Sequence, residues 1–290
     1  MVIRIPPPQR ALALTAAVML ALGACLHAST NDPFPAGYGM STFNCIIRHD
    51  DFSGRQPWLP ASLLKDSLTF GFAAHGVYFY DAMDNLRETA IRQISIGGWW
   101  QIAKYLTIKA AYARFSALDI YLEDIGQFSA GSQVLKYLNI SIELEGFRTG
   151  LRDSDVAKHR SLFAGASLSV PLKYLSFTAR AGKLLNLSLT DDTYRPPRQL
   201  SFGLHTTHGT FGSQGMVLEY TDVEAERIRF FLGEEFWLTP NLGIHFAFAT
   251  NPLLIGFGFA VNVKSLSSYA GFVHHGELGW SKGFGVDWAQ

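Results

Sequence analysis

Residues 136–147 read KYLNISIELEGF, and they decide the fold because apolar and polar side chains alternate through them without a break. Every second residue from Leu138 to Leu144 is apolar, and the residues between them, from Asn139 to Glu145, are polar. Successive side chains of a β-strand point to opposite faces. One face of this strand therefore meets an apolar medium and the other a polar one.

The same phrase recurs along the chain. It reads KYLTIKAAYARF from Lys104, KYLSFTARAGKL from Lys173 and, in relaxed form, PNLGIHFAFATN from Pro240. The two-residue period continues from Ser67 almost to the C-terminus and predicts fourteen strands, with twelve as the alternative if two weak strands merge. The predicted strands are 67–80, 89–101, 105–116, 127–135, 137–149, 160–172, 174–187, 200–205, 216–221, 227–238, 242–249, 253–263, 268–274 and 278–288.

Short turns alternate with longer polar loops, as they do in membrane barrels with an even number of strands. The predicted fold is all-β: a transmembrane antiparallel up-and-down β-barrel, which satisfies every backbone group inside lipid. A secreted soluble β-sandwich or barrel is the alternative. The membrane barrel is favoured by the low charged fraction, 17%, and by the small residues on the polar face, such as Gly256, Gly258 and Ala260.

Two charged residues do not fit a membrane barrel directly. Glu234 and Lys282 fall on the apparent lipid face, so either a bulge shifts the register or they lie at the membrane interface. The last strand carries Phe284, Val286 and Trp288 on one face. Such an ending is similar to the signal read by the barrel assembly machinery, which is an expected partner together with outer-membrane lipid.

The N-terminus is predicted to be a signal peptide, residues 1–28, because Arg4 and Arg10 precede an apolar run that ends in small residues. Cys25 offers an alternative, as the lipidated first residue of a lipoprotein. Residues 29–66 do not alternate and contain prolines and glycines, so they are irregular, and residues 67–290 form the barrel. The expected location is the outer membrane of a Gram-negative-type bacterium.

The irregular segment from Ala36 resembles the entry segment of the long-chain fatty-acid transporter family of outer-membrane barrels and of its relative, the type IX secretion shuttle barrel. The resemblance rests on Gly39-Met40, Asp50-Asp51 and Pro60-Ala61-Ser62-Leu63, with departures at Ser41, Leu59 and Ser62. It implies that residues 29–66 fold inside the barrel as a plug. It also implies either uptake of a hydrophobic small molecule or binding of an exported protein.

Charged residues on the polar face are the candidate site. They are Lys109, Glu143, Glu145, Arg180, Arg229, Glu235 and His245. Buried charges need partners, so a structural network that anchors the plug is one interpretation and a substrate path is the other. Asp50 and Asp51 are expected to dock the plug onto Lys109 or Arg180.

The sequence gives little support to nucleic-acid binding, enzyme activity or metal binding. No basic cluster suits nucleic acid, and the mature chain has no Gly-x-Ser-x-Gly elbow, so we expect neither a nucleic-acid partner nor an enzyme. His205 and His208 are three residues apart and would face opposite ways on a strand; His274-His275 is expected at a loop tip. We therefore expect no metal or other cofactor. Passive transport of small hydrophobic solutes is the leading function, and an exported-protein partner or a purely structural barrel are the alternatives.

Overall fold

The computed structural model describes residues 68–79, 91–103, 106–117, 121–135, 137–151, 159–172, 174–187, 198–207, 211–222, 227–251, 253–275 and 279–289. The predicted signal peptide (1–28) and plug (29–66), and with them Cys25, Asp50 and Asp51, lie outside the described residues. The described strands are β1 Leu68–Phe79, β2 Ile91–Ala103, β3 Leu106–Ala117, β4 Tyr121–Leu135, β5 Leu138–Leu151, β6 His159–Pro171, β7 Leu175–Asn186, β8 Gln199–Thr207, β9 Gly212–Thr221, β10 Ile228–Thr239, β11 Leu242–Ala249, β12 Leu254–Val263, β13 Leu266–His275 and β14 Gly279–Ala289.

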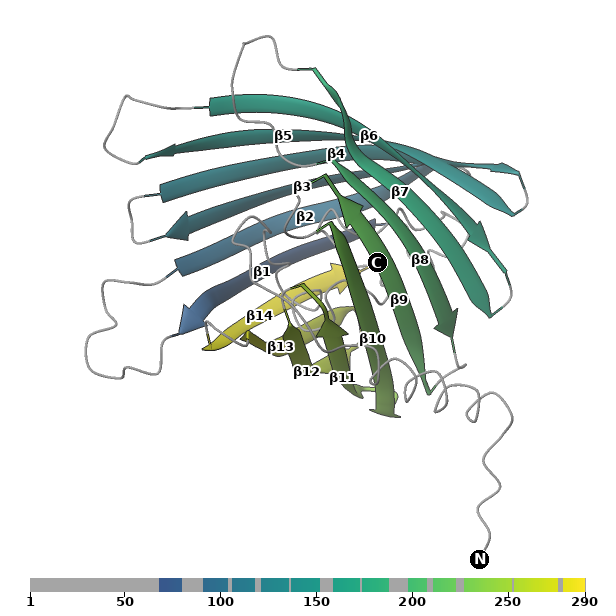
Figure 1. Cartoon of the computed structure of the whole chain (residues 1–290). Coiled ribbons are helices and arrows are strands. Elements are labelled where there is room, and N and C mark those ends of the chain that lie inside the picture. The colour runs from purple at the N-terminus through teal and green to yellow at the C-terminus, as the bar shows by residue number, and fades with distance from the viewer. Residues whose placement is uncertain are drawn as a thin grey trace, which may run out of the picture.

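The strands form a closed ring. Each pairs antiparallel with the next along the chain, and β1 pairs with β14 from Thr69 opposite Ala289 to Phe79 opposite Trp280. Figure 1 shows consecutive strands side by side around the sheet. A closed ring leaves no free sheet edge, which is what a sheet inside lipid requires. The predicted up-and-down barrel of fourteen strands is confirmed, and the alternative of twelve strands is excluded.

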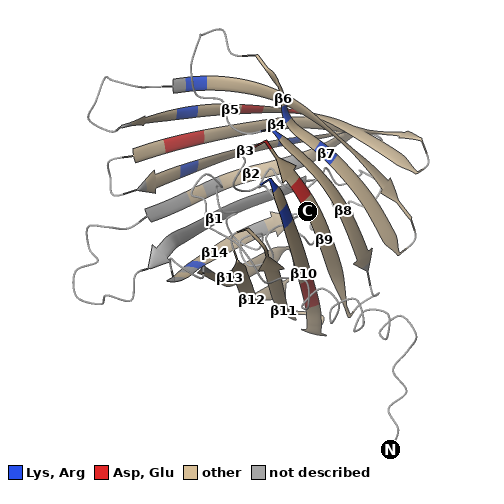
Figure 2. Ribbon diagram, viewed as in Figure 1, with Lys and Arg blue, Asp and Glu red and all other residues tan. Residues whose placement is uncertain are grey.

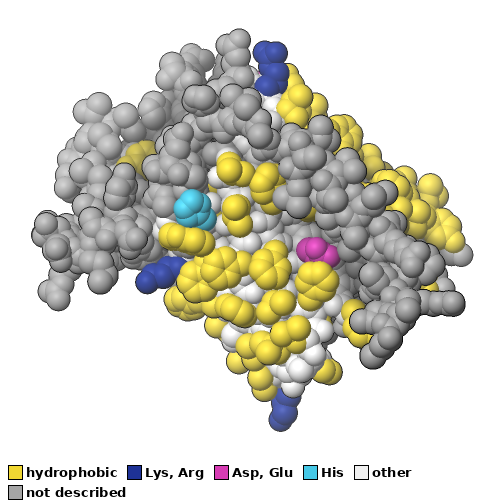
Figure 3. All heavy atoms as spheres, turned by 60° about the horizontal axis from the view of Figure 1, so that its bottom comes forward, with side chains coloured by type: hydrophobic (Ala, Val, Ile, Leu, Met, Phe, Trp, Pro, Cys, Tyr) yellow, Lys and Arg dark blue, Asp and Glu magenta, His cyan; other side chains and the backbone are white. Residues whose placement is uncertain are grey.

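Apolar side chains face outward and polar side chains face the lumen. On β5, Ile140 and Ile142 are 43% and 63% exposed, whereas Ser141 and Glu145 are 4% and 7% exposed. Figure 3 shows the same arrangement from outside, as a wall covered largely by apolar side chains. The predicted alternation is thus confirmed, and its apolar face is the outer one. Among the described residues, no helix is long and apolar enough to cross a membrane.

The two ends of the ring differ in the length of their connections. One end, called here the short-turn end, holds the start of β1, the end of β14 and the connections 104–105, 136–137, 172–174, 208–211, 240–241 and 264–265. The other end, called the long-loop end, holds the connections 80–90, 118–120, 152–158, 187–198, 222–227, 250–253 and 276–278. This asymmetry is typical of outer-membrane barrels.

Two predicted strand starts are wrong by four residues or more. The strand predicted from Met216 begins at Gly212, as β9. The sequence pattern also predicts a loop over residues 118–126 and a strand beginning at Gln127, but β4 begins at Tyr121. The acids Glu123 and Asp124 suggest a loop because charges disfavour membrane strands. They are accommodated because Glu123 faces the lumen while Asp124, facing outward, accepts hydrogen bonds from Tyr112 and Arg114.

Glu234 and Lys282 both face outward. The ladders on both sides of Glu234 keep their register, and so does the β13–β14 ladder at Lys282, whereas the β1–β14 ladder shifts register between Gly76 and Phe79, next to the Gly76–Lys282 pair. The two residues even share one row of the sheet, which runs Glu234, Phe246, Phe257, Phe272, Lys282 across β10–β14. Lys282 is close to the long-loop end of β14, whereas Glu234 is in the middle of β10. Glu234 is therefore the costly charge.

Replacing Glu234 with leucine should raise the free energy of unfolding in lipid vesicles by about 1–2 kcal/mol, because an acid on the lipid face costs somewhat less than the ~2–4 kcal/mol of a basic residue. Denaturant titration followed by tryptophan fluorescence measures the change. The matched control is Glu235→Leu, because Glu235 faces the lumen and accepts a hydrogen bond from Ser213. That variant should lose stability, and equal losses in both variants would contradict the assignment of faces.

Candidate functional site

The lumen is lined by charged side chains from strands on one side of the ring. Figure 2 shows acids and bases on β3–β7, β9 and β10, and those that face inward are Lys109, Glu123, Glu143, Glu145, Arg180, Lys183, Glu219, Arg229 and Glu235. His205 and His245 face inward as well and are buried. The inward placement follows from the two-residue period, because each of these residues alternates with an outward-facing neighbour.

Arg180 on β7 is the centre of this network. Its Nε lies 2.8 Å from Glu143 Oε1, and its terminal nitrogen lies 4.0 Å from Glu145 Oε2. Nη1 donates a weaker hydrogen bond of 3.4 Å to Gln199 Oε1. The Arg180 side chain is 2% exposed. A buried guanidinium needs this many acceptors, because its charge has lost its water.

Arg180 on β7 and Glu143 on β5 contact each other across the intervening strand β6 because the residue between them, Gly165, has no side chain. A Cβ at Gly165 would lie 2.6 Å from Glu143 Oε1 and 2.7 Å from the backbone oxygen of Ala181. Both distances are shorter than van der Waals contact allows. The close approach of the ion pair over β6 thus depends on the missing side chain.

A bulge in β7 brings Lys183 into the same network. The β6–β7 ladder shifts register between Ala164 and Ala166, and Lys183 has a φ of 56°. A left-handed backbone is uncommon for lysine and is held here by contacts. Lys183 Nζ lies 4.0 Å from Glu145 Oε1 and 4.8 Å from the centre of the Phe147 ring. The bulge turns the side chain from the wall into the lumen.

A second pair continues the network around the wall. Arg229 Nη1 lies 3.8 Å from Glu219 Oε1, and the two side chains are 3% and 2% exposed. Arg180, Ser201, Glu219 and Arg229 occupy one row of the sheet across β7–β10. We call the charged set Glu143, Glu145, Arg180, Lys183, Glu219 and Arg229 the charged arc. Because acids and bases alternate in it, its charges largely neutralise one another.

Other predicted lumen residues lie beside the arc. Glu235 is opposite His245 in the β10–β11 ladder, and its Oε2 accepts a hydrogen bond of 3.3 Å from Ser213. His245 is fully buried. Lys109 on β3 faces inward, two strands from Glu143 on the same row. In the described ranges, no group of three or more potential metal ligands occurs.

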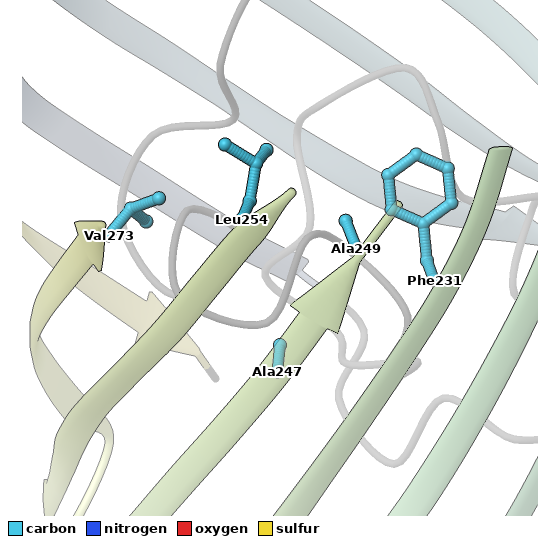
Figure 4. Packing of buried hydrophobic residues seen from close by; sticks show 5 residues of the cluster. All are labelled: Phe231, Ala247, Ala249, Leu254 and Val273. Atoms are coloured by element: carbon cyan, nitrogen blue, oxygen red, sulfur yellow. The ribbon is translucent and has the colours of Figure 1, made fainter. Parts of the chain in front are cut away.

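Two apolar clusters face the lumen toward the long-loop end. Figure 4 shows the first, Phe231, Ala247, Ala249, Leu254 and Val273, from β10–β13. Ala249 ends β11 and Leu254 begins β12, so the cluster lies where those strands meet a long-loop connection.

The second cluster is on the opposite stretch of wall. It consists of Ile125, Phe147 and Phe163 from β4–β6, with the two rings edge to face at 5.9 Å. Phe147 and Phe163 each lie four residues from the long-loop end of their strand. Along β5, Phe147 is closer to that end than Glu143 and Glu145 are, so the apolar residues come before the charges when the lumen is entered from there.

No family model matches the sequence, and no curated protein matches it significantly. Solved structures do. A FadL homologue from Pseudomonas aeruginosa aligns with a TM-score of 0.56 at 10% identity, over 92% of this chain and 99% of that one. The chain has the fold of an outer-membrane β-barrel.

Two further solved outer-membrane barrels also align with this chain. The Ralstonia pickettii toluene transporter TbuX aligns with a TM-score of 0.54 at 9% identity, over 78% of this chain and 89% of that one. Omp33 of Acinetobacter baumannii aligns with a TM-score of 0.51 at 12% identity, over 78% and 98%. The likeness to FadL-type barrels supports that side of the resemblance seen in the sequence. The likeness to the type IX shuttle barrel stays a prediction.

The barrel brings Glu143, Glu145 and Arg180 together, and Arg229 joins them through Glu219. Sequence reasoning missed Glu123, Lys183 and Glu219. Glu219 could have been found, because Val217, Glu219 and Thr221 share one face of a predicted strand. Lys183 could not, because only the bulge turns it inward.

The prediction that His274 lies at a loop tip is wrong. His274 is part of β13 and not of a loop, and its ring meets Trp280 edge to face at 4.8 Å on the outer wall. His205 is buried in the lumen face of β8, and His208 and Glu277 lie outside the described residues. The strand ends at His275, one residue beyond the predicted strand end, so His275 belongs to β13 as well.

Proposed function

We propose that the barrel resides in the outer membrane of a Gram-negative-type bacterium, with its long-loop end outside, and passes small hydrophobic solutes passively. Outer-membrane barrels carry short turns on the periplasmic side and longer loops outside. Both ends of this barrel's strand series, the start of β1 and the end of β14, then face the periplasm.

The pair of apolar clusters at the long-loop end is the observation that carries this proposal. A membrane barrel that passes only polar solutes has no need to place phenylalanines on its inner wall. Phe147, Phe163 and Phe231 face the lumen and are 5%, 3% and 1% exposed, so they would offer a hydrophobic solute the contacts it lacks in water only when their present neighbours move aside. The fold shared with a toluene transporter agrees with this choice of cargo.

The charged arc is the proposed barrier below those clusters. Its acids and bases are paired with one another, and these pairs help to hold them in position. An uncharged solute can pass beside such pairs, whereas an ion would have to compete with them. The arc thereby separates hydrophobic solutes from ions.

Residues 29–66 are proposed to act as the plug, docked by Asp50 or Asp51. Arg180 already contacts Glu143 and Glu145, which makes it the weaker of the two predicted docking residues. Lys109 is the other predicted docking residue, and it faces inward on β3. Movement of the plug would then open the route past the arc without breaking the arc itself.

Replacing Phe163 with asparagine should reduce retention of an uncharged oleate ester, methyl oleate, by the detergent-purified barrel about tenfold, because burying one aromatic side chain against a ligand contributes about 1.5–3 kcal/mol. Native mass spectrometry measures the retained fraction. Phe177→Asn is the matched control, because Phe177 faces outward on β7 and is 47% exposed.

Equal retention in the two variants would contradict a lumenal binding site. Co-purification of an exported protein in place of methyl oleate would favour the type IX shuttle alternative. Only variants that migrate as folded barrels in semi-native electrophoresis enter the comparison.

A further inference from the structure

The lumen carries an acid at its long-loop end that does not belong to the charged arc. Glu123 is the third residue of β4, whose first residue, Tyr121, follows the connection 118–120 of the long-loop end. Figure 2 shows acidic residues at this end of β4. Glu123 faces the lumen and is partly exposed. Glu145 lies opposite Gln127, deeper along the same strand, so a ligand entering from the long-loop end meets Glu123 before the arc.

Glu123 adds a negative charge to a wall whose charges are otherwise balanced. The charged arc has equal numbers of acids and bases. Lys183, a base of the arc, acts on Glu123 electrostatically, but its Nζ lies 4.0 Å from Glu145 and 4.8 Å from the centre of the Phe147 ring. Oε2 of Glu123 accepts a hydrogen bond of 3.2 Å from the Tyr121 hydroxyl. Among the described residues, Glu123 forms no ion pair.

Two aromatic rings lie beside Glu123 on the same face of the sheet. Phe115 is directly opposite Glu123 in the β3–β4 ladder, and Tyr121 is the preceding lumenal residue of β4. The two ring centroids are 6.2 Å apart, and the rings meet edge to face at 68°. Both side chains are partly exposed, as Glu123 is. The acid and the two rings are therefore within reach of a ligand in the mouth of the lumen.

A carboxylate beside two aromatic rings suits an organic cation. The face of a ring attracts a cation within about 6 Å of its centre, and groups of such rings bind quaternary ammonium compounds. The barrel shows the same attraction close by, where Lys183 lies over the Phe147 ring. A metal ion is a poorer match, because it requires three or four convergent ligands, and the described part of the chain has no group of three or more potential ones.

The wall below Glu123 suits the apolar part of such a ligand. Ile125 is the next lumenal residue of β4 and belongs to the apolar cluster with Phe147 and Phe163. Ala113 is directly opposite Ile125 on β3, and its small side chain is partly exposed. From the long-loop end inward, the wall thus presents first a negative charge between rings and then apolar side chains. A hydrophobic ammonium ion has the matching order, a charged end and an apolar body.

We propose that Phe115, Tyr121 and Glu123 form a binding site for a hydrophobic organic ammonium ion. Glu123 pairs with the positive charge, the two rings contact the carbon groups attached to nitrogen, and the apolar body lies over Ala113 and Ile125. The site is at the mouth of the lumen, so a ligand can bind there without passing the charged arc. It is distinct from the passage of neutral hydrophobic solutes proposed above.

The test uses the full barrel in lipid nanodiscs, titrated with benzyltrimethylammonium in an isothermal titration calorimeter, with empty nanodiscs as the blank. Glu123→Gln should weaken binding about tenfold, because it removes the opposite charge and keeps the size of the side chain. Phe115→Leu should weaken binding about threefold, because it removes one ring from the cation. Neopentylbenzene, the neutral compound in which carbon replaces the nitrogen, should show no dependence on Glu123.

Asp124→Asn is the matched control. It removes the same charge from the next residue of β4, whose side chain faces outward and accepts hydrogen bonds from Tyr112 and Arg114. Binding of benzyltrimethylammonium should be unchanged in this variant. Three results would overturn the proposal: equal losses from Glu123→Gln and Asp124→Asn, a Glu123→Gln variant that binds like the wild type, or a wild-type barrel that binds no more than empty nanodiscs.

Discussion

Replacing Arg180 with methionine should lower the free energy of unfolding in lipid vesicles by about 3–5 kcal/mol, because Glu143 and Glu145 would be left buried without their main cation. Glu143 lies 2.8 Å from Arg180 Nε, and the Arg180 side chain is 2% exposed, so water cannot take the place of the guanidinium. Denaturant titration in vesicles gives the change directly.

The control is Arg114→Met, which breaks an ion pair of 2.7 Å in which the arginine side chain is 51% exposed. Arg114 lies three residues from the long-loop end of β3, where water at the membrane surface screens the pair, so the loss should stay below about 1 kcal/mol. Combining Arg180→Met with Glu143→Leu should recover part of the stability, because the unpaired acid is removed with its partner. Equal losses from Arg180→Met and Arg114→Met would show that the charged arc is not a buried network.

Replacing Gly165 with alanine should destabilise the barrel by about 1–3 kcal/mol, which is the usual cost of overpacking a close contact. The new Cβ would lie 2.6 Å from Glu143 Oε1 and 2.7 Å from the backbone oxygen of Ala181. The Glu143 side chain can move, but the backbone oxygen belongs to the β6–β7 wall. The ion pair to Arg180 should therefore lengthen together with the loss of stability.

Gly146→Ala is the matched control on the neighbouring strand. There the new Cβ meets its nearest atoms at 3.9 Å, an ordinary contact, so stability should change little or rise slightly. Denaturant titration compares the two, and removal of the carboxylate in a Glu143→Ala, Gly165→Ala double variant should relieve part of the loss. If Gly165→Ala matched Gly146→Ala, Glu143 would not cross closely over Gly165.

The ring of strands is predictable because it rests on a regular period. Each strand has one face toward lipid and one toward the lumen. Adjacent residues such as Ile142 and Glu143 therefore differ in polarity. The same period is enough to place Lys109, Glu145 and Arg180 in the lumen. It also places Glu234 outward, against the preference of a charge for water, and the ladder keeps it there.

The features that the sequence does not predict depend on contacts between strands. The pattern of a single strand contains no information about such contacts. Asp124 suggests a loop because its partners, Tyr112 and Arg114, are on another strand. Lys183 enters the lumen only through a bulge, and Gly165 matters only because Glu143 crosses over it. The sequence pattern also does not show that Arg148 lies opposite Arg160, because only the register of β5 and β6 brings them together.

The central claim is that this barrel passes hydrophobic solutes but not ions. Lipid vesicles containing the purified barrel allow both to be measured in one preparation, as toluene influx and as ionic current across a planar bilayer of the same lipid. We predict toluene influx faster than in empty vesicles, with no steady current at moderate voltage. A steady ionic current without accelerated toluene influx would contradict the account and identify an ion-conducting pore.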